Sequence, residues 1–63
     1  MKSYSSRDII QLLQADGWYL VHSVGSHQQY KHKTKKGKVT VPHPKKDLTH
    51  KTVVSIFKQA GIE

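Results

Sequence analysis

Apolar residues near the start of the chain recur at helical spacing: Ile9, Ile10, Leu12 and Leu13. Ser5 stands three residues before Asp8, and a serine followed at this distance by an acidic residue is typical of the first turn of a helix. Asp16-Gly17 comes after the last apolar position, and glycine often ends a helix because it adopts the left-handed conformation without strain. The pattern therefore predicts a helix that begins at Ser5 and ends at Asp16-Gly17.

The next stretch has the aromatic and β-branched residues that are typical of strands. Gly25-Ser26 fits a two-residue hairpin, because glycine in the first central position suits a type II′ turn. A turn that contains Gly37 reverses the chain again, and Pro42 and Pro44 are expected to end the sheet because neither can donate a backbone hydrogen bond. Three strands are thus predicted, over Trp18–Val24, His27–Lys33 and Lys38–Val41.

A second helix is predicted toward the other end of the chain. Thr49 is suited to cap it and Gly61 to close it, and apolar residues between them follow i, i+3, i+4, i+7 spacing: Val53, Ile56, Phe57 and Ala60. The predicted fold class is α+β, as one small domain over residues 1–63: a helix, a three-stranded antiparallel sheet and a helix, with both helices able to cover the same sheet face. This order resembles a shortened double-stranded-RNA-binding domain.

Side-chain alternation assigns the strand residues to two faces of the sheet. If Tyr30, Val39 and Val41 point toward the helices, polar and basic residues share the opposite, open face: His27, Gln29, Lys31, Lys33, Lys38 and Thr40. His27 then lies at the mouth of a tight hairpin and at the head of a row of lysines. We expect the functional chemistry on this open face.

Charge is strongly segregated along the chain. The sequence has 11 Lys and Arg against 4 Asp and Glu, a net charge of +7. The excess falls between Lys31 and Lys51, where Asp47 is the sole acidic residue. A face that serves only solubility usually mixes the two signs, so this segregation favours a basic surface that binds a polyanion.

Composition removes several classes of function. Without cysteine the chain has no disulfide, no thiolate nucleophile and no cysteine-based zinc site. We find no signal peptide and no apolar run of membrane-spanning length, so a soluble, cytoplasmic protein is expected, with no membrane partner. The histidines lack the H-x-x-x-H spacing of a helical metal site, and nucleotide-cofactor motifs are missing, so neither a metal nor another cofactor is expected.

Histidine is the residue type that suits proton transfer near neutral pH, because its pKa is about 6.5. Metal-independent RNA cleavage needs a base for the 2′-hydroxyl proton, an acid for the leaving 5′ oxygen and cations for the charged phosphorane. His27 is the strongest candidate, because Gly25 permits close approach of a phosphate and Ser26 can donate to it. The product would carry a 2′,3′-cyclic phosphate.

A lone histidine at a strand start is more often structural than catalytic, and other histidines compete for the role: His22, His32, His43 and His50. His32 is expected to point with Tyr30 toward the helices, as a structural or edge-exposed residue. His50 falls in the first turn of the last helix. His43, held between two prolines, is the best second histidine.

Three ordered segments carry a family resemblance: Gly25–His32 (GSHQQYKH), Val39–Leu48 (VTVPHPKKDL) and Ile56–Gly61 (IFKQAG). Together with the opening helix that runs into Asp16-Gly17-Trp18, they are similar to the HicA (YcfA-like) toxins of bacterial type II toxin-antitoxin modules. The resemblance implies ribosome-independent cleavage of messenger RNA and a HicB antitoxin that binds and masks the active surface. It also implies a catalytic role for His27, which follows Gly-Ser as the catalytic histidine of the family does.

The sequence thus predicts a metal-independent endoribonuclease with His27 as general acid or base. The residues predicted to bind RNA lie around it: Gly25, Ser26, Gln29, Lys31, Lys33, Lys38, His43, Lys45 and Lys46. Two other functions stay open. One is a non-catalytic RNA-binding module of the same fold, which would use the same lysines, and the other is a structural protein that docks an acidic partner.

Overall fold

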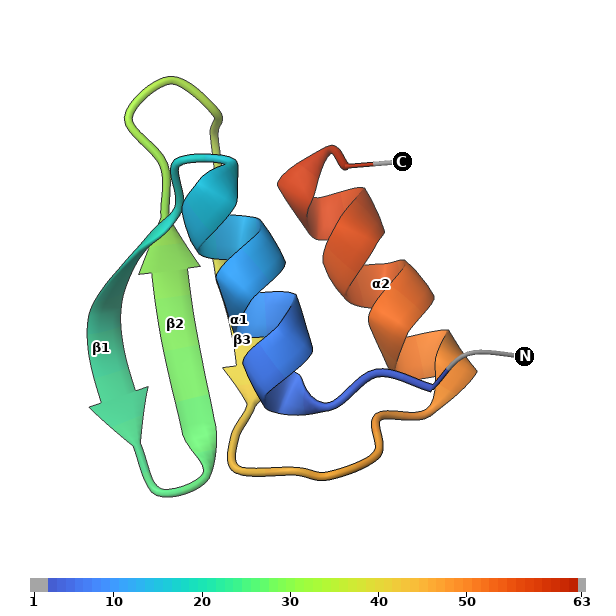
Figure 1. Cartoon of the computed structure of the whole chain (residues 1–63). Coiled ribbons are helices and arrows are strands. Elements are labelled where there is room, and N and C mark those ends of the chain that lie inside the picture. The colour runs from blue at the N-terminus through green and yellow to red at the C-terminus, as the bar shows by residue number, and fades with distance from the viewer. Residues whose placement is uncertain (1–2, 63) are drawn as a thin grey trace.

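The computed structural model describes residues 3–62 as two helices and a three-stranded antiparallel sheet (Figure 1). The elements are α1 (Ser6–Ala15), β1 (Tyr19–Val24), β2 (His27–Lys31), β3 (Val39–Pro42) and α2 (His50–Ala60). The strands lie in the order β1-β2-β3, so β2 is central and pairs with both neighbours. The predicted α+β class and the order of its elements are confirmed.

Both helices begin and end where their local signals placed them. Ser5 caps α1 through a reciprocal pair of hydrogen bonds with Asp8, and Thr49 accepts the Thr52 amide at the start of α2. After α1 the Gly17 φ is +103°, and the Gly17 and Trp18 amides donate back to the carbonyls of Gln14 and Leu13. This Schellman arrangement satisfies carbonyls that the helix end would leave unpaired.

The hairpin between β1 and β2 sets the position of His27. Val24 pairs with His27, and the Gly25 φ of +54°, followed by a Ser26 without positive φ, fits the predicted type II′ turn. Further along β1, Val21 is an extra residue between the Leu20 and His22 pairings. Such a bulge reverses the alternation, so Leu20 shares the α1 side with its partner Tyr30.

β1 is also an edge of the sheet. Its outer side carries no strand within residues 3–62, and its large apolar side chains are exposed: Tyr19, Leu20, Val21 and Val24.

β2 ends at Lys31 rather than at Lys33 as predicted, because His32 is anchored to the end of α1. The His32 Nε2 atom lies 2.7 Å from the Asp16 carbonyl oxygen, and its Nδ1 accepts the amides of Thr34 and Lys35 at 3.1 and 3.2 Å. Nδ1 is therefore unprotonated and Nε2 donates. The ring packs edge-on against Trp18, so the structural reading of His32 is confirmed.

The sheet ends at Pro42 as predicted, but Pro42 itself belongs to β3 and pairs with His27, so the strand runs one residue past the predicted Val41. The next amide, of His43, donates to the Ser26 carbonyl at 2.8 Å. Since hydrogen-bonded and non-hydrogen-bonded pairs alternate in antiparallel sheets, His27 and Pro42 form a non-hydrogen-bonded pair. The Pro42 nitrogen then faces the free edge of β3, where no donor is needed.

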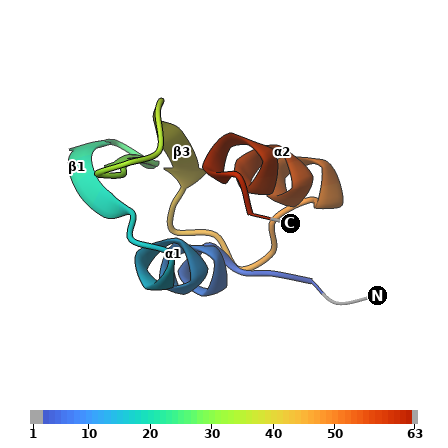
Figure 2. The same cartoon turned by 90° about the horizontal axis from the view of Figure 1, so that it is seen from above.

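The two helices do not lie on the sheet in the same way. Seen from above, α1 lies under the sheet, whereas α2 lies beside β3 at about the level of the strands (Figure 2). The buried apolar residues fill the space between these elements: Ile9, Leu13, Trp18, Tyr30, Val39, Val41, Leu48, Val53, Ile56 and Ala60. Tyr30, Val39 and Val41 are at most 1% exposed, which confirms the predicted face assignment. None of the helices in residues 3–62 has the length and apolar character to span a membrane.

Candidate functional site

The open face of the sheet carries part of the row of side chains that the alternation predicted, without Lys33 and Lys38, which lie outside the strands. His27, Gln29 and Lys31 alternate along β2 with Gln28 and the buried Tyr30, and Gln28 accepts a hydrogen bond from the Tyr30 hydroxyl on the other face. Thr40 of β3 pairs with Gln29. His27 and Lys31 are exposed and Gln29 is half-buried, so the row is accessible along its length.

His27 differs from the structural histidines in its surroundings. Its side chain is exposed, and within residues 3–62 its imidazole makes no hydrogen bond. Both nitrogens are thus available to a ligand, whereas a ring with a fixed tautomer is committed to its partners. The adjacent Gly25 and Ser26 are exposed as well, and a Cβ built on Gly25 would meet no atom within 4 Å.

His43, the predicted second histidine, points away from His27 toward α1. Its Nδ1 lies 2.7 Å from the hydroxyl of Ser6, which is only 2% exposed. The Ser6 hydroxyl also accepts the Lys45 amide at 2.9 Å, and the Ser6 amide donates to the Lys45 carbonyl. This network ties the segment after β3 to the start of α1, so His43 has a structural role and does not join His27.

The remaining two histidines lie on different sides of the molecule. His22 pairs with Gln29, which places it on the open face one diagonal step from His27. Among the described residues it is the one other histidine on that face. His50 lines an apolar hollow with Tyr4 and Phe57, away from the open face.

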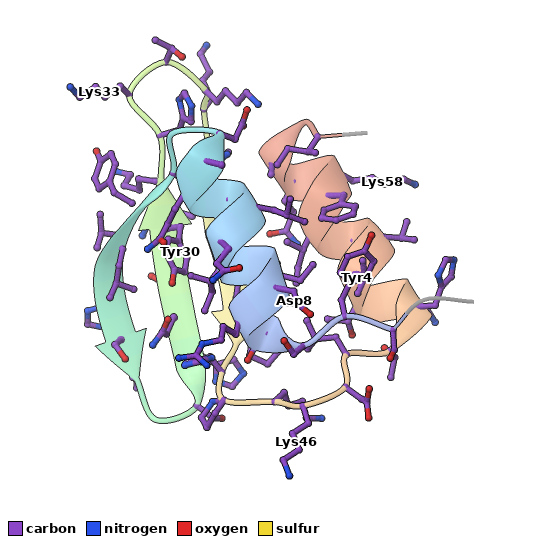
Figure 3. The ribbon with its side chains drawn as sticks, viewed as in Figure 1. Tyr4, Asp8, Tyr30, Lys33, Lys46 and Lys58 are labelled. Atoms are coloured by element: carbon purple, nitrogen blue, oxygen red, sulfur yellow. The ribbon has the colours of Figure 1, made fainter. Side chains whose placement is uncertain are left out.

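The lysines predicted to bind RNA are divided between the two ends of the sheet. β2 runs from His27 to Lys31, so the loop over residues 32–38 is about 13 Å of strand away from the hairpin. Lys33 and Lys38 belong to that loop, while Lys45 and Lys46 follow β3 at the hairpin end. Figure 3 shows Lys33 and Lys46 at opposite ends of the molecule.

Lys35 is held by the fold. Its ammonium group lies 2.5 Å from the Asp16 carboxylate and 3.0 Å from the Ala60 carbonyl oxygen, so it joins the ends of both helices. The Lys35 hydrogen bond lowers the pKa of Asp16 below its ordinary value, against a smaller effect of desolvation. This contribution to stability is present at neutral pH and is lost as the pH falls through the lowered pKa.

A surface hollow of about 380 Å³ lies between β3 and α2, and we call it the β3–α2 hollow. His27 lies at one wall with two residues of β3, Thr40 and Pro42. The other wall belongs to α2: Lys51, Thr52, Ser55, Ile56 and Gln59. The residues of this second wall were not predicted from the sequence. In the sequence these polar residues form a stripe at helical spacing, next to the apolar stripe of the same helix. They come close to His27 only because α2 lies next to β3.

Comparisons with known proteins agree with this fold. Among solved structures, a toxin-antitoxin complex from Streptococcus pneumoniae contains a chain that is 27% identical, with a TM-score of 0.76 over 92% of this chain and 97% of that chain. The fold is therefore that of a small toxin-antitoxin protein. Residues 6–62 match the family described as the HicA toxin of bacterial toxin-antitoxin, so the chain belongs to the HicA toxin family, which confirms the resemblance. No curated protein matched the sequence.

Proposed function

We propose that this protein is a toxin that cleaves messenger RNA without the ribosome and without a metal, in the cytoplasm, with His27 as its catalytic residue. The observation that carries the proposal is the His27 imidazole, exposed and without a hydrogen bond inside residues 3–62, at the mouth of the hairpin. Membership of the HicA toxin family supports it. The whole chain would act as one ribonuclease domain.

The reaction uses the 2′ oxygen of the RNA as nucleophile. His27 either removes the 2′-hydroxyl proton or protonates the 5′ oxygen as the bond from phosphorus to that oxygen breaks. The products are a 2′,3′-cyclic phosphate and a free 5′-hydroxyl. Lysines along the open face and at the hairpin end stabilise the added negative charge of the phosphorane. His22 shares the face and is our candidate for the second proton transfer, in preference to His43.

The direct test is to incubate the purified protein with a messenger RNA in EDTA, without ribosomes. We expect strand scission and fragments that end in a 2′,3′-cyclic phosphate. A non-catalytic RNA-binding module would bind the same RNA and leave it intact. A protein that only docks an acidic partner would not bind it at all.

RNA binding is expected to depend strongly on salt. The logarithm of the binding constant should fall by about 0.7 per unit of log salt for each phosphate neutralised on a single strand. Replacing Lys31 and Lys33 with alanine should flatten this slope. Both side chains are exposed, Lys31 at the end of β2 and Lys33 in the loop that follows it. The control is Lys58→Ala, since Lys58 points outward from α2 (Figure 3). An unchanged slope in the double variant would place the RNA elsewhere.

We also propose that a HicB-type antitoxin neutralises the toxin in a hetero-oligomeric complex, by covering His27 and the nearby lysines with acidic side chains. The similar structure is a toxin-antitoxin complex, and masking both the chemistry and the charge requires contact with this face. Lys45→Ala with Lys46→Ala should slow antitoxin association, most at low salt, and Lys58→Ala should not. A complex in which His27 stays open to solvent would contradict direct masking.

A further inference from the structure

The β3–α2 hollow has features of a binding site that the catalytic proposal does not use. It is a shallow groove, open to solvent, with a volume of about 380 Å³. One wall includes His27, so a molecule in the hollow is next to the proposed catalytic group. The other wall is a stripe of α2, because Lys51, Ser55 and Gln59 are four residues apart and thus fall on one side of the helix.

The two walls of the hollow run in opposite directions along the chain, and this determines which side chains face each other at each end. β3 descends toward Pro42 and the hairpin end, while α2 rises from His50 to Ala60 (Figure 1). His27 and Lys51 are therefore at one end, and Thr40 and Gln59 are at the other. Lys51 and Gln59 are separated by about 12 Å of helix. This length accommodates a phosphate at the first end and the attached nucleoside toward the second.

The side chains at the two ends suit different parts of a nucleotide. Lys51 is exposed and brings a cation to the end that holds His27. The Gln59 amide, which donates to Ser55 at 3.2 Å, has both a donor and an acceptor for the edge of a base. Apart from His27, which the proposed reaction occupies, none of the lining residues is aromatic, and Ile56 lies buried at the floor of the hollow. Base selection here would therefore come from hydrogen bonds rather than from stacking.

We propose that the β3–α2 hollow binds one nucleotide of single-stranded RNA beside the bond that is cut, with Lys51 on the phosphate and Gln59 and Ser55 on the base. The inference rests on the proposed ribonuclease function and extends it, because it assigns sequence preference to α2 rather than to the lysine-rich loops. A double-stranded RNA would not fit, since its bases are already paired along the edges that Gln59 would contact.

The first experiment compares Lys51→Ala with Lys58→Ala, which remove the same charge from the same helix. The readout is binding of a 2′-O-methyl RNA, which lacks the nucleophile and cannot be cut. Lys51→Ala should weaken binding about tenfold, as expected for a lost charge-assisted hydrogen bond, and should lower the salt slope by about 0.7. Lys58→Ala should leave both values at wild type. Equal effects of the two variants would overturn the phosphate assignment.

The second experiment compares Gln59→Ala and Ser55→Ala with Gln14→Ala, a matched glutamine in the last turn of α1. Binding is measured to 2′-O-methyl oligonucleotides that differ at one base. The first two variants should lower the ratio of best to worst sequence about tenfold, and Gln14→Ala should preserve it. An unchanged ratio in Gln59→Ala and Ser55→Ala would overturn the base assignment. Because no RNA is cut in either assay, failure of the ribonuclease proposal would be seen separately, as an inactive wild-type protein.

Discussion

His27→Ala is expected to lower the rate of RNA cleavage by about 10² to 10⁴, the usual loss when a general acid or base is removed. The fold should survive, because the His27 side chain is exposed and makes no hydrogen bond within residues 3–62. Its truncation leaves no core cavity, so stability should change by no more than about 0.5 kcal/mol. Cleavage of a test messenger and thermal melting, measured on the same preparations, check both parts.

Two companion variants separate catalysis from structure. His43→Ala removes one of the hydrogen-bond partners of the buried Ser6 hydroxyl, so it should cost about 1 kcal/mol of stability and lower Tm by several degrees in a domain of this size. His22→Ala should slow cleavage while the protein melts normally. Cleavage by His27→Ala at the wild-type rate, with loss of cleavage in a folded His43→Ala, would reverse the two roles.

Gly17→Ala is expected to be the most destabilising single change among the glycines, at about 2 to 5 kcal/mol. An alanine there must adopt a φ of +103°, which costs roughly 1 to 2 kcal/mol. Its Cβ would also lie 2.7 Å from the His32 Nε2 atom, and overpacking at such a site costs about 1 to 3 kcal/mol. The ring cannot simply move aside, because it is bonded to the Asp16 carbonyl. Urea unfolding of wild type and variant measures the loss.

Gly37→Ala is the matched control for this clash. Its φ of +86° is similarly strained, but a Cβ there meets no atom within 4 Å. It should therefore cost only the backbone strain, about 1 to 2 kcal/mol. The difference between the two variants measures the rigidity of the His32 anchor. Equal losses would mean that the His32 ring yields freely and does not fix the end of β2.

Most of the fold could be predicted from signals within a few residues of each helix or strand. The caps at Ser5 and Thr49 and the glycines after the helices depend on neighbours within one turn, so the sequence contains the whole signal. Alternation along β2 and β3 was equally local, and it placed Tyr30 in the core and His27 on the open face. The bulge at Val21 was not predicted, because the sequence of β1 contains no feature that distinguishes an inserted residue from a regularly paired one.

Contacts between distant segments account for what could not be predicted. β2 stops at Lys31 because His32 bonds to Asp16, sixteen residues earlier. His43 turns from His27 because Ser6, 37 residues away, holds its ring. In the sequence, the polar stripe of α2 is indistinguishable from a solvated helix face: Lys51, Ser55 and Gln59. Only the position of α2 beside β3 shows that it lines a hollow. For the site, the sequence therefore indicated the catalytic candidate and the open face, but not the opposite wall.

The exposed edge at β1 gives the free toxin a tendency to associate with itself. An edge strand with one unpaired side and four exposed apolar side chains is a template onto which a second chain can add. The net charge of +7 opposes this, because copies repel one another over a Debye length of about 10 Å at 0.1 M salt and about 3 Å at 1 M. The lysines that we propose bind RNA would thus also oppose self-association, and concentrated salt should weaken both effects at once.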